Sequence, residues 1–186
     1  MAFLEVLTRC YKRPTWLAEN QASLRSQSDP DYVQTLIVDD VGIGVARANA
    51  RLADVAPTLT GFYVWVLDDD DLCIRDDLVA ELKRTVGACR TAPAAIVVRM
   101  DHDELGVLPD VDRWWGQVPP EGGIGASALI VRRDVFVAYA DWWRTGRYAA
   151  DYDFMQAVLR NEDHVVWLDL VASRVQRRSI GRPEGV

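Results

Sequence analysis

The chain has 186 residues, 49% of them apolar, which is most simply one soluble domain with a hydrophobic core of its own. Its formal net charge of -7 argues against a general binder of nucleic-acid backbones, because such domains are usually basic. Three separated cysteines without a CxxC pair, no signal peptide and no apolar run of membrane-spanning length indicate a reduced, cytoplasmic protein without a membrane span.

Strands and helices alternate through the first half of the chain. Apolar runs and helical spacing predict, in order, a strand at 3–8, a helix at 15–27 behind Thr15 as N-cap, a buried strand at 33–38, a helix at 46–56, a strand at 62–67, a helix from 78 to about 86 and a strand at 94–100. Such alternation is typical of an α/β fold with a doubly wound, mostly parallel sheet flanked by helices.

The chain is organised around strand 62–67 and the four aspartates that follow it. Six large apolar, β-branched or aromatic residues predict a strand buried on both faces, and Asp68 to Asp71 end it. Successive residues point to opposite sides, so we expect Asp68 and Asp70 on one face. Carboxylates about 5 Å apart repel by roughly 3 kcal/mol at an effective dielectric of about 20. The run therefore favours a bound cation, and oxygen ligands suit Mg²⁺ or Mn²⁺; the alternative is a solvated turn.

Two other predicted strands also end in acidic residues. Asp39 and Asp40 follow strand 33–38, and residues 101–104, which begin with Asp101, follow strand 94–100. Ligands of open α/β sheets bind in the crevice at the carboxyl ends of the strands. The sequence therefore predicts a ligand site at this edge of the sheet.

The second half of the chain is less regular. A Gly- and Pro-rich stretch at 116–127 has the length of a functional or mobile loop. After it the pattern predicts a strand at 128–131, a short helix at 134–139, a helix from 151 to about 161, a strand at 165–168 and an arginine-rich tail.

Four motifs in the first half together resemble a family 2 glycosyltransferase of the GT-A fold. They lie at residues 8–14, 38–40, 44–49 and 66–71. Residues 132–136 and 150–153 are similar to the acceptor-side strand–helix and the acidic catalytic motif of that family. The resemblance implies a single GT-A-like domain over residues 1–186, with a nucleotide-binding half at 1–100 and an acceptor-side half at 101–186.

The resemblance also implies a donor site for a nucleotide-diphosphate sugar, and a UDP-sugar is the expected donor. It places Tyr11 against the base, Asp39 in a hydrogen bond to the base and Arg47 near the phosphates, with Thr8 and Arg13 in the first nucleotide-binding motif. Alternatively, Tyr11 simply covers the first helix, and Arg47 is a solvated helix residue.

Within the acidic run, the resemblance gives each carboxylate a role. Asp68 and Asp70 take the DxD positions of a metal site, where Asp70 holds the Mn²⁺ or Mg²⁺ that bridges the donor diphosphate. Asp69 reaches the ribose.

For catalysis, the resemblance implies inversion at the anomeric carbon with Asp151 as the general base. The family usually has an acidic residue directly before the base, and here that position is Ala150. Asp153 is therefore an alternative base, and Asp151 is alternatively an N-cap of the last helix.

The acceptor is the least defined partner, and a glycan, a protein or a modified DNA base all remain open. Trp114, Trp115 and Asp101 are expected on the acceptor side, although tryptophan pairs, including Trp142 and Trp143, are as often core. Arg177 and Arg178 in the tail are expected to bind a polyanion, either the donor diphosphate or nucleic acid.

Two other functions are compatible with the pattern. The first is a nucleotidyltransferase-like enzyme, which normally has a Gly-rich phosphate loop after its first strand, whereas residues 7–14 contain no glycine. The second is a non-catalytic GT-A-like module that binds a sugar or a partner.

Overall fold

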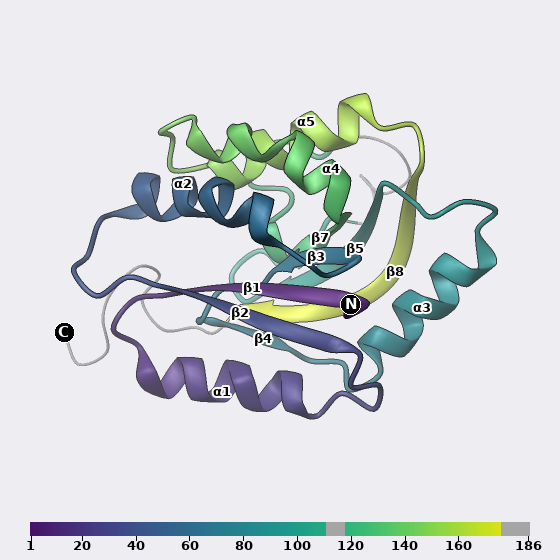
Figure 1. Cartoon of the computed structure of the whole chain (residues 1–186), viewed down its shortest axis with the longest axis horizontal. Coiled ribbons are helices and arrows are strands. Elements are labelled where there is room, and N and C mark those ends of the chain that lie inside the picture. Colours follow the sequence, from purple (N-terminus) through teal and green to yellow (C-terminus); the bar gives the residue numbers. More distant parts are fainter. Residues whose placement is uncertain (111–117, 176–186) are drawn as a thin grey trace.

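A sheet of eight strands forms the middle layer of the computed structural model, which describes residues 1–110 and 118–175 (Figure 1). Its strands are β1 (Leu4–Cys10), β2 (Tyr32–Val38), β3 (Tyr63–Val66), β4 (Asp71–Cys73), β5 (Ala95–His102), β6 (Gly106–Leu108), β7 (Leu129–Arg132) and β8 (Val165–Val175). They run in the order β2-β1-β3-β7-β5-β8-β4, and β6 pairs with β5 as a side branch.

The sheet is mixed rather than mostly parallel. Strand β1 is parallel to both β2 and β3, and β5 is parallel to β8. Strand β7 lies antiparallel between β3 and β5, and the pairs β4–β8 and β5–β6 are also antiparallel. The expected proportion of parallel pairs was too high because apolar periodicity carries no information on strand direction, which the connections between strands decide.

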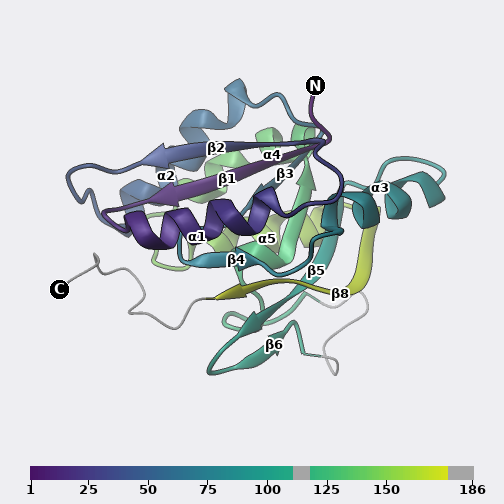
Figure 2. The same cartoon turned by 90° about the horizontal axis from the view of Figure 1, so that it is seen from below.

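Helices cover both faces of the sheet, as the alternating pattern predicts (Figures 1 and 2). Helices α1 (Pro14–Arg25) and α3 (Leu78–Ala88) lie on one face, and α2 (Val45–Val55), α4 (Arg133–Ala138) and α5 (Ala150–Asn161) lie on the other. Short 3-10 helices occupy Ala56–Thr58, Ala126–Ala128 and Ala140–Arg144. The expected α/β fold class, one domain with helices around a sheet, is therefore confirmed.

The central strand β3 is buried on both faces, as predicted. Val64 and Val66 contribute to the core under α2, α4 and α5, whereas Tyr63 and Trp65 contribute to the core under α1 and α3. The indole nitrogen of Trp65 donates a hydrogen bond to the Ser127 carbonyl oxygen at 2.9 Å. This strand thus fixes the starting point of the acidic run that follows it.

The prediction that strand 33–38 is buried was wrong. Strand β2 lies at the edge of the sheet, and Val33, Leu36 and Val38 are exposed. A run of apolar β-branched residues fits an edge strand as well as a central one, because only the strand order decides what covers it. Two short strands, β4 and β6, were not predicted at all, and Asp71, expected in the acidic run that ends strand 62–67, is the first residue of β4.

None of the helices in the described part of the chain is both long and apolar enough to cross a membrane.

Candidate active site

A cavity of about 410 Å³ opens at the carboxyl ends of β1 and β2 and beside the acidic run, within the usual size range of small-molecule sites. Its lining comes from the β1 exit, the β2–α2 loop, helix α2, the acidic run and the start of α5: Arg9, Cys10, Tyr11, Arg13, Ile37, Asp39, Gly42, Ile43, Gly44, Val45, Ala48, Asn49, Arg51, Asp68, Asp70, Tyr148 and Asp151. The cavity lies at the sheet edge where the sequence predicts a ligand site.

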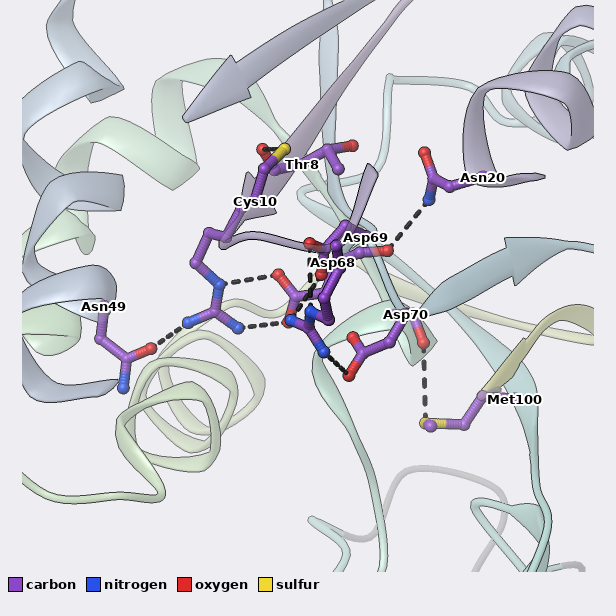
Figure 3. Close-up of polar contacts among 11 residues, drawn as sticks. Thr8, Cys10, Asn20, Asn49, Asp68, Asp69, Asp70 and Met100 are labelled. Carbon is purple, nitrogen blue, oxygen red and sulfur yellow. Dashed lines mark hydrogen bonds and ion pairs between the residues drawn. The ribbon is translucent and has the colours of Figure 1, made fainter. Parts of the chain in front are cut away.

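Two arginines at the exit of β1 clamp the acidic run. Arg9 makes a bidentate pair with Asp68, with Nε 2.7 Å from Oδ1 and Nη2 2.5 Å from Oδ2. Arg13 pairs with Asp69, with Nη2 2.5 Å from Oδ1, and its Nη1 lies 2.6 Å from Asp70 Oδ2. Dashed lines around Asp68, Asp69 and Asp70 in Figure 3 mark these contacts. In this structure the chain itself thus supplies cations that the run of carboxylates requires.

Arg9 also contacts side chains outside the acidic run, on α2 and in the 3-10 helix Ala140–Arg144. Its Nη1 donates to the side-chain oxygen of Asn49 on α2 (Figure 3). Its guanidinium carbon lies 5.9 Å from the centre of the Trp143 ring, within the range of a cation–π contact. Burial works against the charged form, but Asp68, Asp151 and Asp70 together outweigh it and raise the pKa of Arg9. Sequence reasoning missed Arg9 and Asn49; the available signal was the need for a cation beside the four aspartates.

The backbone of the acidic run is held from helix α1. The amide nitrogen of buried Asn20 donates to the carbonyl oxygens of Asp68 and Asp71, at 2.9 and 2.8 Å. Gln34 on β2 in turn donates to the side-chain oxygen of Asn20 at 2.7 Å. These bonds satisfy a buried polar turn and fix the direction in which its carboxylates point.

Alternate aspartates of the run point to opposite sides, as expected for an extended chain. Asp68 and Asp70 line the cavity. Asp69 and Asp71 are buried and do not line it. Burial raises the pKa of Asp69 to about 7, with Arg13 opposing the rise. Burial, followed by the nearby Asp70 and Asp68, raises the pKa of Asp71 well above its usual value. Asp69 was expected to reach a ribose. In this structure its carboxylate forms an ion pair with Arg13.

Tyr11 and Asp39 lie together at the β2 end of the cavity. The Asp39 carboxylate accepts hydrogen bonds from the backbone N–H groups of Val41, Gly42 and Ile43 at 3.1, 2.8 and 2.8 Å. Although burial opposes ionisation, these bonds lower the pKa of Asp39. The Tyr11 ring packs against Gly42, where an added Cβ would lie 2.5 Å from the Tyr11 hydroxyl. The carboxylate and the ring thus share a wall of the cavity with the β2–α2 loop.

Two other residues expected at the nucleotide do not line the cavity. Thr8 is buried in β1, and its hydroxyl accepts a hydrogen bond from Gln34 at 2.8 Å. Arg47 is exposed on α2. One helical turn further on, Arg51 does line the cavity and donates to the Val38 carbonyl oxygen at 2.5 Å.

The two candidate bases have different surroundings. Asp151, in the first turn of α5, lines the cavity. Burial raises the pKa of Asp151, with the Tyr152 N–H and Arg9 opposing the rise. Asp153 does not line the cavity, and its carboxylate accepts from Thr145 at 2.8 Å and from Arg147 at 2.6 Å. The geometry therefore brings Asp151, and not Asp153, to the acidic run.

Of the residues expected on the acceptor side, those that the structure describes do not line the cavity. Asp101 on β5 pairs with Arg174 at 2.8 Å and does not line it. Trp143 is a core residue, stacked on Phe154 at 5.0 Å between ring centres. Trp114, Trp115, Arg177 and Arg178 lie outside the described residues. An unpredicted aromatic, Tyr148, lines the cavity and is 71% exposed.

Whether a divalent metal fits this site depends on which carboxylate oxygens are not already paired with an arginine. Among residues 1–110 and 118–175, no group of three acidic, histidine or cysteine side chains forms a metal site. Both oxygens of Asp68 accept hydrogen bonds from Arg9, so a metal at Asp68 would share that carboxylate with a guanidinium. Arg13 contacts only Oδ2 of Asp70. Asp70 therefore fits a Mg²⁺-type site of one carboxylate completed by substrate phosphates.

Neither a family model nor a curated protein matches the sequence. Solved structures share the fold. TarS of S. aureus, residues 1–349 with UDP-GlcNAc, is 13% identical with a TM-score of 0.67, covering 96% of this chain and 59% of that one. The mannosyltransferase PcManGT of Pyrobaculum calidifontis, with GDP-Man and Mn²⁺, is 15% identical with a TM-score of 0.62. The match covers 92% of this chain and 56% of that one. A197 from STIV is 12% identical with a TM-score of 0.54, and the match covers 91% of this chain and 82% of that one.

The chain thus spans about three fifths of the TarS and PcManGT chains to which it is similar. At these identities the likeness shows a common fold. It is the fold of proteins whose structures contain UDP-GlcNAc and GDP-Man.

Proposed function

We propose that this protein is a glycosyltransferase that moves a sugar from a nucleotide-diphosphate donor, most simply a UDP-sugar, to an acceptor hydroxyl. One observation carries the proposal: side chains from three distant segments, Asp39, the pair Asp68 and Asp70, and Asp151, line one cavity. These are positions to which the resemblance assigns base recognition, diphosphate binding and proton transfer. The nucleotide sugars bound by TarS and PcManGT on the same fold support this assignment.

The lining suggests how a donor would lie. The base fits beside Tyr11 and Asp39, where the aromatic ring offers a stacking face and the carboxylate accepts hydrogen bonds. The diphosphate then lies over the floor formed by Arg9, Arg13 and Asp70, and the sugar lies toward Asp151. Guanidinium groups match phosphate oxygens well because their N–H donors are arranged as a fork.

In the proposed reaction, Asp151 takes the proton of the acceptor hydroxyl as its oxygen attacks the anomeric carbon. The bond from that carbon to the diphosphate oxygen breaks on the opposite side, so the configuration inverts. Burial raises the pKa of Asp151, which makes its carboxylate a stronger base than a solvated aspartate. A divalent metal held by Asp70 would neutralise charge on the departing diphosphate.

The proposal is tested with a panel of UDP- and GDP-sugars and Mn²⁺. We expect one of them to raise the melting temperature of the protein and to be hydrolysed slowly when water replaces the acceptor. A non-catalytic module would bind the donor without hydrolysis. A nucleotidyltransferase would instead make a nucleotide sugar and pyrophosphate from a nucleoside triphosphate and a sugar phosphate. A protein that neither binds nor hydrolyses any member of the panel would contradict the proposal.

The acceptor remains open among a glycan, a protein and a modified DNA base. To separate these classes, we propose to incubate the protein and the donor identified above with one acceptor class at a time. The class that accelerates release of the nucleoside diphosphate is the acceptor.

A further inference from the structure

Arg9 is fixed more firmly than a solvated cation in a binding site. Three of the five N–H groups of its guanidinium donate to the two oxygens of Asp68 and to Asn49. The side chain of Arg9 is 18% exposed and that of Asp68 is 23% exposed. The pair joins the end of β1 to the end of β3, and Asn49 adds α2. Two parallel hydrogen bonds between ionised groups make this ion pair stronger and more defined in geometry than a single contact between solvated side chains.

Arg9 nevertheless faces the cavity. It is one of the residues that line it, and its two remaining N–H groups have no hydrogen bond within the described part of the chain. The same cavity is lined by Asp39, Asp68, Asp70 and Asp151. A diphosphate that enters it meets carboxylates of its own sign of charge, and this repulsion opposes binding. Binding therefore requires fixed positive charge on the cavity floor.

We propose that Arg9 is a donor-binding residue that replaces one carboxylate–metal contact in this site. It withholds Asp68 from any metal and offers its free N–H groups to the donor diphosphate. Asp70 is then the one carboxylate of the acidic run that is open to a metal. The inference rests on the proposed function, because it assumes a diphosphate ligand.

The first experiment compares Asp68→Asn with Asp70→Asn by calorimetric titration of UDP, with Mn²⁺ and with EDTA. Asparagine keeps an oxygen that accepts from Arg9 but removes the negative charge. We expect Asp68→Asn to keep the Mn²⁺-dependent gain in UDP affinity and Asp70→Asn to lose it. Loss of that gain in Asp68→Asn as well would make Asp68 a metal ligand and overturn the proposal.

The second experiment removes the guanidinium with Arg9→Met. We expect the dissociation constant of UDP to rise by about tenfold or more, the scale of one charge-assisted contact to phosphate. Mn²⁺ alone should bind more tightly than to the wild type, because Asp68 becomes available beside Asp70. Titration of Mn²⁺ followed by electron paramagnetic resonance measures this second effect. General damage to the fold would weaken both ligands, so the opposite directions are diagnostic.

Arg9→Lys keeps the charge but not the bidentate pair, so we expect an intermediate UDP affinity. Arg84→Met is the matched control, because Arg84 is exposed on α3, on the opposite face of the sheet. If Arg9→Met binds UDP and Mn²⁺ as the wild type does, the role of Arg9 is wrong. If the wild type itself binds none of UDP, GDP or their sugars, the proposed function fails, which is a distinguishable result.

Discussion

At the scale of single residues, the site depends on how neighbouring carboxylates share a few cations. Asp68 is paired with Arg9, whereas Asp69 and Asp70 share Arg13. Asp151 reaches the same cavity from α5 without a comparably close ion pair among the described residues. Chemically similar side chains are thereby divided between carboxylates held in close ion pairs and one that lines the cavity without such a pair.

We expect Asp151→Asn to lower turnover by roughly 10² or more, the scale of a lost general base, while donor affinity stays within a few fold. Asp153→Asn is the matched control, since its carboxylate is bound by Thr145 and Arg147 and does not line the cavity. Steady-state kinetics of nucleoside diphosphate release measure both. Were Asp153→Asn to cause the larger loss, the base assignment would be wrong.

The pH profile reports on the same group. A general base must be ionised, so the rate should fall as the pH falls through the pKa of Asp151. Burial raises the pKa of Asp151 above its usual value of 3.8, so this acidic limb should lie at a higher pH than for a solvated aspartate. The limb should vanish from the residual activity of Asp151→Asn. A limb that persists there unchanged would belong to another group.

Asp71 offers a prediction about stability. Burial raises the pKa of Asp71 in the folded state, so the folded protein binds this proton more tightly than the unfolded chain does. That contribution is present at low pH and is lost as the pH rises from about 4. Asp71→Asn should therefore be more stable than the wild type at pH 8, by on the order of 1 kcal/mol, and nearly equal at pH 4. Urea unfolding at both pH values measures the difference, and a destabilised variant at pH 8 would contradict it.

At the scale of elements, the β2–α2 loop shows how local backbone geometry shapes the cavity. Gly42 and Gly44 both have positive φ, at +83° and +82°, where glycine is the least strained residue. The loop is closed onto Asp39 by three backbone hydrogen bonds and lies against Tyr11. A small change in this loop should therefore alter the end of the cavity where Tyr11 and Asp39 lie.

Gly42→Ala and Gly44→Ala form a matched pair, because both place alanine at nearly the same φ. We expect each to cost about 1–3 kcal/mol of stability from the backbone alone, because such backbone conformations strain residues other than glycine. Only at Gly42 does the new Cβ meet the Tyr11 hydroxyl, whereas at Gly44 no atom lies within 4 Å. Gly42→Ala should therefore weaken UDP binding more, by several fold. Equal affinities of the two variants in calorimetry would argue against a role for Tyr11 and this loop in holding the base.

At the scale of the whole molecule, one sheet carries a core on each face, and both cores run across it. Strands β3 and β5 contribute side chains to both. Because the two cores share these strands, we expect the described parts of the chain to unfold as a single cooperative unit.

Ile96 tests this prediction, because it is fully buried on β5 between β7 and β8. Ile96→Ala should lower the free energy of unfolding by about 2–5 kcal/mol. Val137→Ala is the control, since Val137 is 41% exposed on α4, and a surface change of this kind stays within about 0.5 kcal/mol. Tryptophan fluorescence and far-UV circular dichroism should follow one shared transition in urea. Two separate transitions would show independent units.

Local properties of the sequence determined most of the elements, although not the short strands β4 and β6, and the edge of the sheet at which the cavity lies. The run of large apolar residues at 62–67 includes β3, and aspartates end it because they disfavour a strand. Only the tertiary structure decided that β2 lies at the edge, that β7 is antiparallel and that Asp151 rather than Asp153 lines the cavity. The same holds for the pairing of Arg9 with Asp68 across 59 positions. The spacing of apolar residues indicates helices and strands. Partners that are distant in the chain meet only once strand order and connections are fixed.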